Sequence, residues 1–237
     1  KLDEHGGIER DCATDEIGTV IIKGPGVTPG YVDERFNAGL FSADGWFVSG
    51  DLGRFDKDGY LWLTGRVKDV IIRGGHNIDA GLIEDVLRRH PAVLLCAAVA
   101  KPDAYAGELP VAYVQLVKDK RATAEELKAF VRAEIAERAA TPDEVFIIDP
   151  LPLTDIGKPN KAALRHDAAA RTFTAVLEGI VGSAAGIGVE VKLDPVHGTL
   201  AVVNVESEPA EREAIESRIA DAMKAYTMRH RIDWRHA

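Results

Sequence analysis

The side chains best suited to bind a charged ligand are concentrated in one stretch, GWFVSGDLGRFDKDGYLWLTGRVKDVIIRGGHNID at residues 45–79. Asp51 follows a short apolar run, and its carboxylate can accept hydrogen bonds from two hydroxyl groups of a ligand. Arg66 comes later, and a rigid guanidinium suits sugar and phosphate oxygens. Taken alone, Asp51 could merely form a turn, and Arg66, Lys68 and Asp69 could be ordinary charged surface. Their order in one stretch favours a binding function.

A glycine pair lies further along the same stretch. Gly74 and Gly75 remove two side chains where a predicted strand ends, so the backbone there can approach a ligand closely. His76 and Asn77 follow the pair. A lone glycine pair usually forms only a turn, and we interpret His76 as a marker of the motif rather than as a catalytic base.

A second candidate is Lys158, in the sequence LPLTDIGK. A lysine in a loop is a flexible point charge that can stabilise developing negative charge and then move away. Lys161 lies close by and is an alternative, although Gly157 immediately before Lys158 favours Lys158. A single loop lysine would otherwise be ordinary surface.

Taken together, these motifs resemble those of the adenylate-forming enzymes, which include acyl-CoA synthetases, adenylation domains of peptide synthetases, and luciferases. KGPGVTPGY at residues 23–31 resembles a loop of that family, and LPLTDIGKPNKAALR at residues 151–165 resembles its C-terminal lysine motif. The sequence departs from the family at Ser49, where threonine is more common, and at Pro159-Asn160, which replace an aliphatic and basic pair.

The resemblance implies roles for three residues of the first stretch. Asp51 would accept the ribose hydroxyls of the nucleotide, and Arg66 would be a second nucleotide contact. Lys68 would be the hinge about which a mobile lid domain turns between two half-reactions.

It also implies roles for residues of the lid. Gly74 and Gly75 would line the tunnel for the phosphopantetheine arm of CoA, and Glu84 matches the acidic residue of the following helix. Lys158 would be the catalytic residue, which contacts the substrate carboxylate and the α-phosphate.

The implied activity is that of an ATP-dependent acyl-CoA synthetase, a ligase of the kind that serves fatty acid metabolism. It converts a carboxylic acid, ATP and CoA into acyl-CoA, AMP and diphosphate through an acyl-adenylate. Its cofactors would be ATP, CoA and Mg²⁺, with the metal ligands outside this chain. Two alternatives remain, the adenylation domain of a peptide synthetase and a non-catalytic association module. The sequence GGHNID, and the lack of a carrier-protein serine motif after residue 165, favour a free-standing CoA ligase.

The resemblance predicts an α+β chain in three parts. Residues 1–66 would be the C-terminal, β-rich part of a large AMP-binding domain, and residues 67–168 the compact α+β lid. Residues 169–237 would form a small α+β tail of unknown role, and a homodimer through this tail is a hypothesis. Because the chain begins at Lys1 and lacks two nucleotide-binding motifs of the family, we expect a C-terminal fragment that is inactive without its N-terminal domain.

Local patterns predict the individual elements. Strands are expected at residues 18–23, 52–55, 60–64, 67–73, 93–100, 111–117, 145–148, 189–193, 200–205 and 229–234. Helices are expected after Asp79, after Thr123 with Glu126 as a capping box, from Asn160 to Leu164, through Leu177 and Ile180, and from Pro209. Residues 36–46 are expected to form a short helix or a loop. We expect His197 and the basic run of residues 229–231 to be solvated surface.

Composition excludes several classes of protein. A net charge of −9 argues against binding to nucleic acid or to an anionic membrane surface. Cys12 and Cys96 lie far apart without metal-type spacing, which favours a reduced, cytoplasmic protein. The longest apolar run, residues 92–100, is too short to span a bilayer, and no signal peptide is visible.

Overall fold

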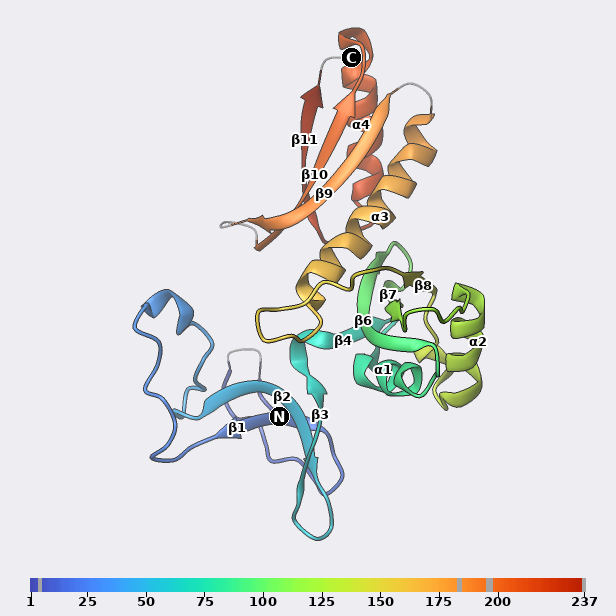
Figure 1. Cartoon of the computed structure of the whole chain (residues 1–237). Coiled ribbons are helices and arrows are strands. Elements are labelled where there is room, and N and C mark those ends of the chain that lie inside the picture. Colours follow the sequence, from blue (N-terminus) through green and yellow to red (C-terminus); the bar gives the residue numbers. More distant parts are fainter. Residues whose placement is uncertain (4–5, 183–184, 195–197, 236–237) are drawn as a thin grey trace. The chain divides into compact units, whose positions relative to one another are not determined.

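The computed structural model describes residues 1–3, 6–182, 185–194 and 198–235. The chain divides into two compact units, Lys1–Val70 and Ile71–Ala237 (Figure 1). Both combine small sheets with short connections or helices, so the predicted α+β class is confirmed. Among the described residues, no helix is both long and apolar enough to cross a membrane.

The first unit is built on an antiparallel sheet of three strands in the order β1-β2-β3. The strands are β1 (Gly18–Ile22), β2 (Phe47–Phe55) and β3 (Leu61–Arg66). Asp56 closes the β2–β3 hairpin, because its Oδ1 accepts the N–H groups of both Asp58 and Tyr60. Gly59 takes the left-handed conformation that this turn requires, with φ of 82°. The hairpin predicted from the Asp-Gly sequence is therefore confirmed.

Two short 3₁₀ helices complete this unit. The first (Glu34–Phe36) ends where the predicted helix or loop begins, and residues 37–46 are loop, turn and an isolated bridge residue. The second (Val67–Asp69) corrects the sequence prediction, which placed a continuous strand at residues 67–73. Only Val70–Arg73 is strand, as β4.

The second unit begins with a five-stranded sheet in the order β5-β4-β7-β6, with β8 also paired to β7. Its further strands are β5 (His76–Asp79), β6 (Val93–Asp103), β7 (Gly107–Leu116) and β8 (Glu144–Ile147). Its helices are α1 (Ala80–Arg88), α2 (Ala124–Glu134), the 3₁₀ turn Arg138–Ala140, and α3 (Lys161–Val181).

Helices cover both faces of this sheet. Alternate residues of β6 point to opposite faces. Cys96 and Ala98 pack in the core that holds Ile83 of α1 and Leu127 of α2. Ala97 and Val99, with residues of β7, pack in a second core against Leu164 and Ala168 of α3.

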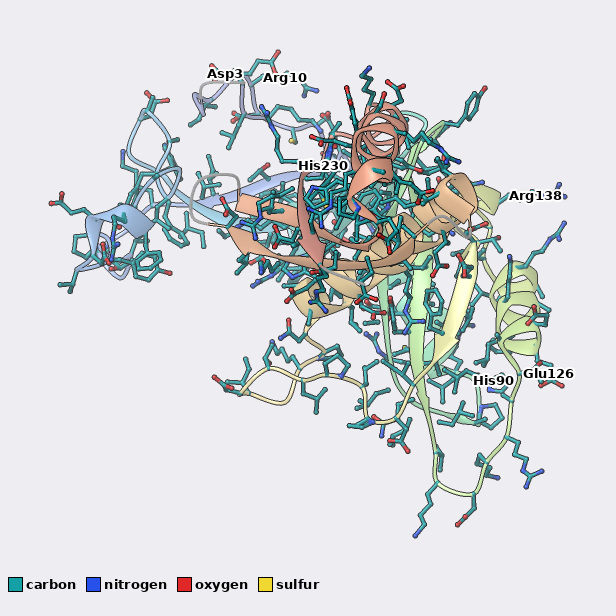
Figure 2. All side chains as sticks on the ribbon, turned by 90° about the horizontal axis from the view of Figure 1, so that it is seen from above. Asp3, Arg10, His90, Glu126, Arg138 and His230 are labelled. Atoms are coloured by element: carbon teal, nitrogen blue, oxygen red, sulfur yellow. The ribbon has the colours of Figure 1, made fainter. Side chains whose placement is uncertain are left out.

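The capping residues predicted from sequence are confirmed. Asp79 accepts the N–H of Gly81 and begins α1. Thr123 and Glu126 form the reciprocal capping box that begins α2. Figure 2 labels Glu126 of α2 and His90, which follows α1. The ring of His90 packs edge-on against that of Phe130 on α2.

The C-terminal part of the second unit is a three-stranded sheet in the order β11-β10-β9. Its elements are β9 (Gly186–Asp194), β10 (Gly198–Glu206), the 3₁₀ turn Pro209–Glu211, α4 (Arg212–Met223) and β11 (Arg229–Arg235). The three strands and the helix after Pro209 were predicted. His197, which was expected to be solvated surface, lies outside the described residues.

Helix α3 joins the two sheets of this unit (Figure 1). Sequence reasoning placed two helices here, one ending at Leu164 and another containing Leu177, whereas the structure has a single helix. Ala168 belongs to the core of the five-stranded sheet, and the next residue, Ala169, belongs to the core of the C-terminal sheet. The predicted division between residues 168 and 169 therefore falls inside a helix that serves two cores.

The basic run in β11 also differs from its prediction. Arg229 and Arg231 are exposed, but His230 between them is partly buried. Strand alternation places His230 on the same face as Ile232 and Trp234, which pack against the core. Burial lowers the pKa of His230 below its ordinary value.

Candidate functional site

Asp51 and Arg66 lie directly opposite each other on β2 and β3. Arg66 Nε donates to Asp51 Oδ1 over 3.1 Å, and both side chains keep contact with solvent, at 68% exposure for Arg66 and 29% for Asp51. A bound ligand can therefore reach the free carboxylate oxygen and the remaining guanidinium N–H groups. The hairpin brings this predicted pair together.

Ser49 fixes the backbone that leads into Asp51. Its hydroxyl donates to the carbonyl of Val20 on β1 over 2.8 Å and accepts the N–H of Asp51 over 3.0 Å. Between them, Gly50 adopts a positive φ of 76°. The family departure at Ser49 therefore retains the hydroxyl that the backbone of Asp51 uses.

Lys158 lies in an exposed loop between β8 and α3 that is closed on itself. Thr154 N–H donates to Lys158 C=O over 2.7 Å, and Lys158 N–H donates back to Thr154 Oγ1 over 3.2 Å. Gly157 supplies the positive φ of 76° at the tip, which disfavours a side chain there. The loop thus has a defined backbone, while the Lys158 side chain is exposed to solvent.

Lys161, the alternative candidate, has a different environment. Its ammonium group lies 2.7 Å from Glu84 Oε1, and its side chain is only 21% exposed. A lysine engaged with a buried carboxylate is less available to a substrate than Lys158. The structure therefore favours Lys158 as the residue that reaches a ligand.

Gly74 and Gly75 form the exposed turn between β4 and β5, with φ of 55° and 85°. Gly74 N–H donates to the carbonyl of Ala106 in the β6–β7 turn. A Cβ at either glycine would meet no atom within 4 Å, so their backbone is open on the side where a side chain would stand. His76 and Asn77 are also exposed.

Lys68 is the middle residue of the 3₁₀ turn Val67–Asp69. The division between the two units falls shortly after it, between Val70 and Ile71. Asp51 and Arg66 thus belong to the first unit, whereas Gly74, Gly75 and Lys158 belong to the second.

Glu84 is a functional candidate whose environment the sequence did not reveal. It is 6% exposed, and it accepts the N–H of Ala98 over 2.9 Å as well as the ammonium group of Lys161. Burial raises the pKa of neighbouring Asp79, against an opposing effect of Lys161, and raises the pKa of Cys96 to about 11. No local sequence pattern links Glu84 to Lys161, because they come from different helices.

A second cluster surrounds Asp167 on α3. Tyr113 Oη donates to Asp167 Oδ2 over 2.7 Å, and Arg171 Nε donates to the same oxygen over 2.6 Å. Burial, together with the hydrogen bond to Asp167, raises the pKa of Tyr113 above its ordinary value. The i, i+4 spacing of Asp167 and Arg171 was the available sequence signal.

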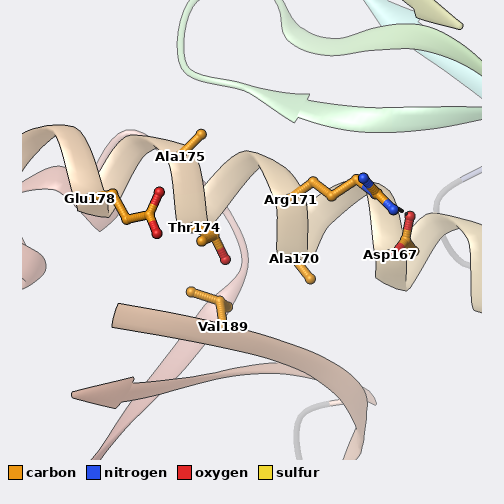
Figure 3. Close-up of a pocket in the computed structure, with 7 residues that line it drawn as sticks. All are labelled: Asp167, Ala170, Arg171, Thr174, Ala175, Glu178 and Val189. Atoms are coloured by element: carbon orange, nitrogen blue, oxygen red, sulfur yellow. Dashed lines mark hydrogen bonds and ion pairs between the residues drawn. The ribbon is translucent and has the colours of Figure 1, made fainter. Parts of the chain in front are cut away.

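Asp167 and Arg171 also border a shallow hollow of about 410 Å³ between α3 and β9 (Figure 3). Its lining includes Ala170, Thr174 and Val189, and the Arg171–Asp167 contact lies at one end of the lining residues. None of the site residues predicted from sequence lines it. The hollow is therefore separate from the candidate site.

Residues 82–158 match the family described as the AMP-binding enzyme C-terminal domain. The chain is 43% identical over 218 residues to marinolic acid–CoA ligase of Pseudoalteromonas sp., covering 92% of this chain and 33% of that protein. It is 37% identical over 171 residues to the medium/long-chain-fatty-acid–CoA ligase FadD8 of Mycobacterium tuberculosis, covering 69% and 29%. The chain thus spans about a third of the length of these curated relatives.

Solved structures similar to this chain include an ATP complex and a CoA synthetase. ATP-bound MatB from Rhodopseudomonas palustris is similar at a TM-score of 0.60 and 32% identity, covering 66% of this chain and 31% of that one. The o-succinylbenzoate CoA synthetase MenE from Bacillus subtilis, in complex with its acyl-adenylate, is similar at a TM-score of 0.60 and 35% identity, covering 67% and 33%.

Proposed function

Because this chain belongs to the adenylate-forming (AMP-binding) superfamily, we propose that it is the C-terminal part of an ATP-dependent acyl-CoA synthetase. The carrying observation is the closed loop that presents Lys158 to solvent while Lys161 is engaged with Glu84. In the first half-reaction, a carboxylate oxygen of the acid attacks the α-phosphorus of ATP, and the bond to diphosphate breaks. In the second, the CoA thiolate attacks the acyl carbon, and AMP leaves.

Lys158 acts in the first half-reaction. Its ammonium group lies beside the oxygens of the reacting carboxylate and α-phosphate and stabilises the negative charge shared between them. An exposed lysine in a loop suits this task, because it can be withdrawn before the thiol arrives.

Asp51 and Arg66 hold the nucleotide. The carboxylate accepts the ribose hydroxyls, and the guanidinium fork donates to ribose or phosphate oxygens. Their mutual contact orients both groups before the nucleotide binds, and this pre-organisation supports the assignment.

Lys68, Gly74 and Gly75 serve the second half-reaction. The second unit, which contains most of the lid predicted at residues 67–168, turns about Lys68, whose location shortly before the division of the two units supports a hinge. This rotation of the lid then presents the open backbone of Gly74 and Gly75 to the pantetheine arm of CoA.

The adenylation domain of a peptide synthetase is not favoured, because the relatives named above are CoA ligases. Association through residues 169–237, as a homodimer, remains a proposal that native mass spectrometry of the full-length protein tests. A cytoplasmic location is likewise a proposal.

ATP is expected to enter with Mg²⁺. Within the part of the chain that the structure describes, no three His, Cys, Asp or Glu side chains are grouped so as to hold a metal ion. We propose that the ligands of this ion belong to residues outside this chain.

The test compares the full-length protein with its Lys158→Ala variant in two assays. One is ATP–pyrophosphate exchange with the acid present, and the other is thioester formation from pre-made acyl-adenylate and CoA. We expect exchange to fall at least about a hundredfold in the variant, as for loss of one transition-state charge contact, while thioester formation persists. Survival of both activities would refute the assignment of Lys158.

A further inference from the structure

Glu84 is a buried charged side chain at the junction of three elements. It belongs to α1 and is 6% exposed. Oε1 accepts the N–H of Ala98 on β6 over 2.9 Å and lies 2.7 Å from the ammonium group of Lys161. Oε2 accepts from Arg88 over 3.2 Å. A buried carboxylate with several charged and polar donors is held in one position.

Lys161 is the first residue of α3, directly after the loop that presents Lys158. Asn160 between them caps the helix, since its Oδ1 accepts the N–H of Ala163. Asn160 N–H also donates to the carbonyl of Pro152 on the other side of the loop, over 2.8 Å. The contact of Lys161 with Glu84 therefore ties the C-terminal end of the loop to α1.

The N-terminal end of the loop is tied separately. Leu151 is 2% exposed, and its N–H donates to the side chain of Gln115 on β7 over 3.1 Å. Both ends thus rest on the five-stranded sheet and its helices, one through a neutral hydrogen bond and the other through an ion pair.

We propose that Glu84 and Lys161 are positioning residues, whose buried ion pair sets where the loop holds Lys158 during adenylate formation. This inference rests on the proposed function. The pair also links the segments proposed for the two half-reactions. Glu84 lies on α1, which follows the Gly74–Gly75 turn through β5, and Lys161 lies on α3, which follows the Lys158 loop.

Loss of the pair should affect one half-reaction more than the other. The helix of Glu84 is also held by its Asp79 cap and by buried Ile83 and Leu87, none of which is removed by a replacement of Lys161. The Lys158 loop, in contrast, loses its ionic attachment. Because small displacements of a reacting group can cost about a hundredfold in rate, we expect a large effect on adenylation.

The test uses three variants of the full-length protein. Lys161→Met removes the charge and retains most of the apolar stem, whereas Lys161→Arg retains the charge. The matched control is Lys101→Met, because Lys101 on β6 pairs with Asp143 and Glu144 and is similarly buried, at 13% exposure against 21% for Lys161.

In Lys161→Met, we expect ATP–pyrophosphate exchange to fall about tenfold to a hundredfold, through kcat rather than through the KM for ATP. Thioester formation from pre-made acyl-adenylate should stay within about twofold, and Lys161→Arg should recover most of the exchange. Lys101→Met should leave the ratio of the two activities unchanged. Amide hydrogen exchange at Thr154, Gly157 and Lys158 should accelerate in Lys161→Met alone.

Two results would overturn the inference. One is an equal loss of both half-reactions, which would show a general structural role, and the other is unchanged exchange in Lys161→Met. Lys158→Ala, measured in parallel, separates this failure from a failure of the proposed function. If Lys158→Ala abolishes exchange and Lys161→Met does not, the function stands and the positioning role is wrong. If the wild-type protein shows no exchange, both fail.

Discussion

Asp51 and Arg66 are cross-strand partners whose side chains meet, with Arg66 Nε 3.1 Å from Asp51 Oδ1. An exposed pair of this kind contributes only about 0–1 kcal/mol to the free energy of unfolding. Ser49 nevertheless adds a hydrogen bond that fixes the backbone of Asp51. The fixed geometry of this pair therefore contributes little to folding, and we propose that it serves ligand binding.

Replacing Arg66 by Met should therefore weaken nucleotide binding with little effect on stability. A lost hydrogen bond to a charged group costs about 1.5–3 kcal/mol, so the KM for ATP should rise about tenfold to a hundredfold. Steady-state kinetics and urea denaturation measure the two effects. Arg54→Met is the control, because Arg54 on β2 pairs with Asp15 in the same unit. An equal rise in KM in the control would contradict a specific role for Arg66.

Gly75→Ala should slow thioester formation and leave ATP–pyrophosphate exchange nearly unchanged. A left-handed conformation costs a non-glycine residue about 1–2 kcal/mol, and the new methyl group would narrow the path of the pantetheine arm. The measurement is the rate of acyl-CoA formation from pre-made acyl-adenylate at several CoA concentrations.

Gly59→Ala separates strain from obstruction. Gly59 has φ of 82°, close to the 85° of Gly75, and its Cβ would also meet no atom within 4 Å. The two variants should lose similar stability in thermal denaturation. If Gly59→Ala slows thioester formation as much as Gly75→Ala does, the tunnel assignment is wrong.

Local signals were sufficient to predict many elements of this fold. Asp79, the Thr123–Glu126 box and the Asp-Gly hairpin each act within a few residues, so their physics is visible in the sequence. The contact between Asp51 and Arg66 could not be predicted in this way. The strand register shifts by one residue between Leu52 and Gly53, so the turn alone would place Gly65, not Arg66, opposite Asp51.

Features that depend on distant partners were not predictable. The sequence predicted helix both before Leu164 and around Leu177 but not that the two form one helix, which packs Phe173 and Leu177 against the C-terminal sheet. Lys161 appeared as a rival to Lys158 until its contact with Glu84 was known. A tertiary ion pair leaves no periodic pattern in either segment.

Thr123→Ala should destabilise the protein without changing either half-reaction. It removes the hydroxyl that accepts the N–H of Glu126 at the start of α2, a loss of about 1 kcal/mol in the free energy of unfolding. Glu126→Gln should cost less, since glutamine can still accept the N–H of Thr123. Urea denaturation and the two partial assays check this, and a selective loss of adenylation would show that α2 affects the site.

His230→Gln should make stability less dependent on pH. Burial lowers the pKa of His230 in the folded protein, whereas the unfolded chain keeps a value of about 6.5. Below that pH the unfolded state binds more protons than the folded state, so the free energy of unfolding decreases as pH falls. Above it, His230 is neutral in both states and contributes no such dependence.

Urea denaturation at pH 5.5 and 7.5 measures the difference for the wild-type protein and the variant. His166 on α3 is the necessary comparison, because burial and Arg165 lower its pKa in the same direction. We expect His230→Gln and His166→Gln each to remove part of the acid destabilisation, and the double variant to remove more. A wild-type stability that rises as pH falls through this range would contradict the sign predicted for both histidines, and an unaltered pH dependence in His230→Gln would show that its inward orientation on β11 does not limit protonation.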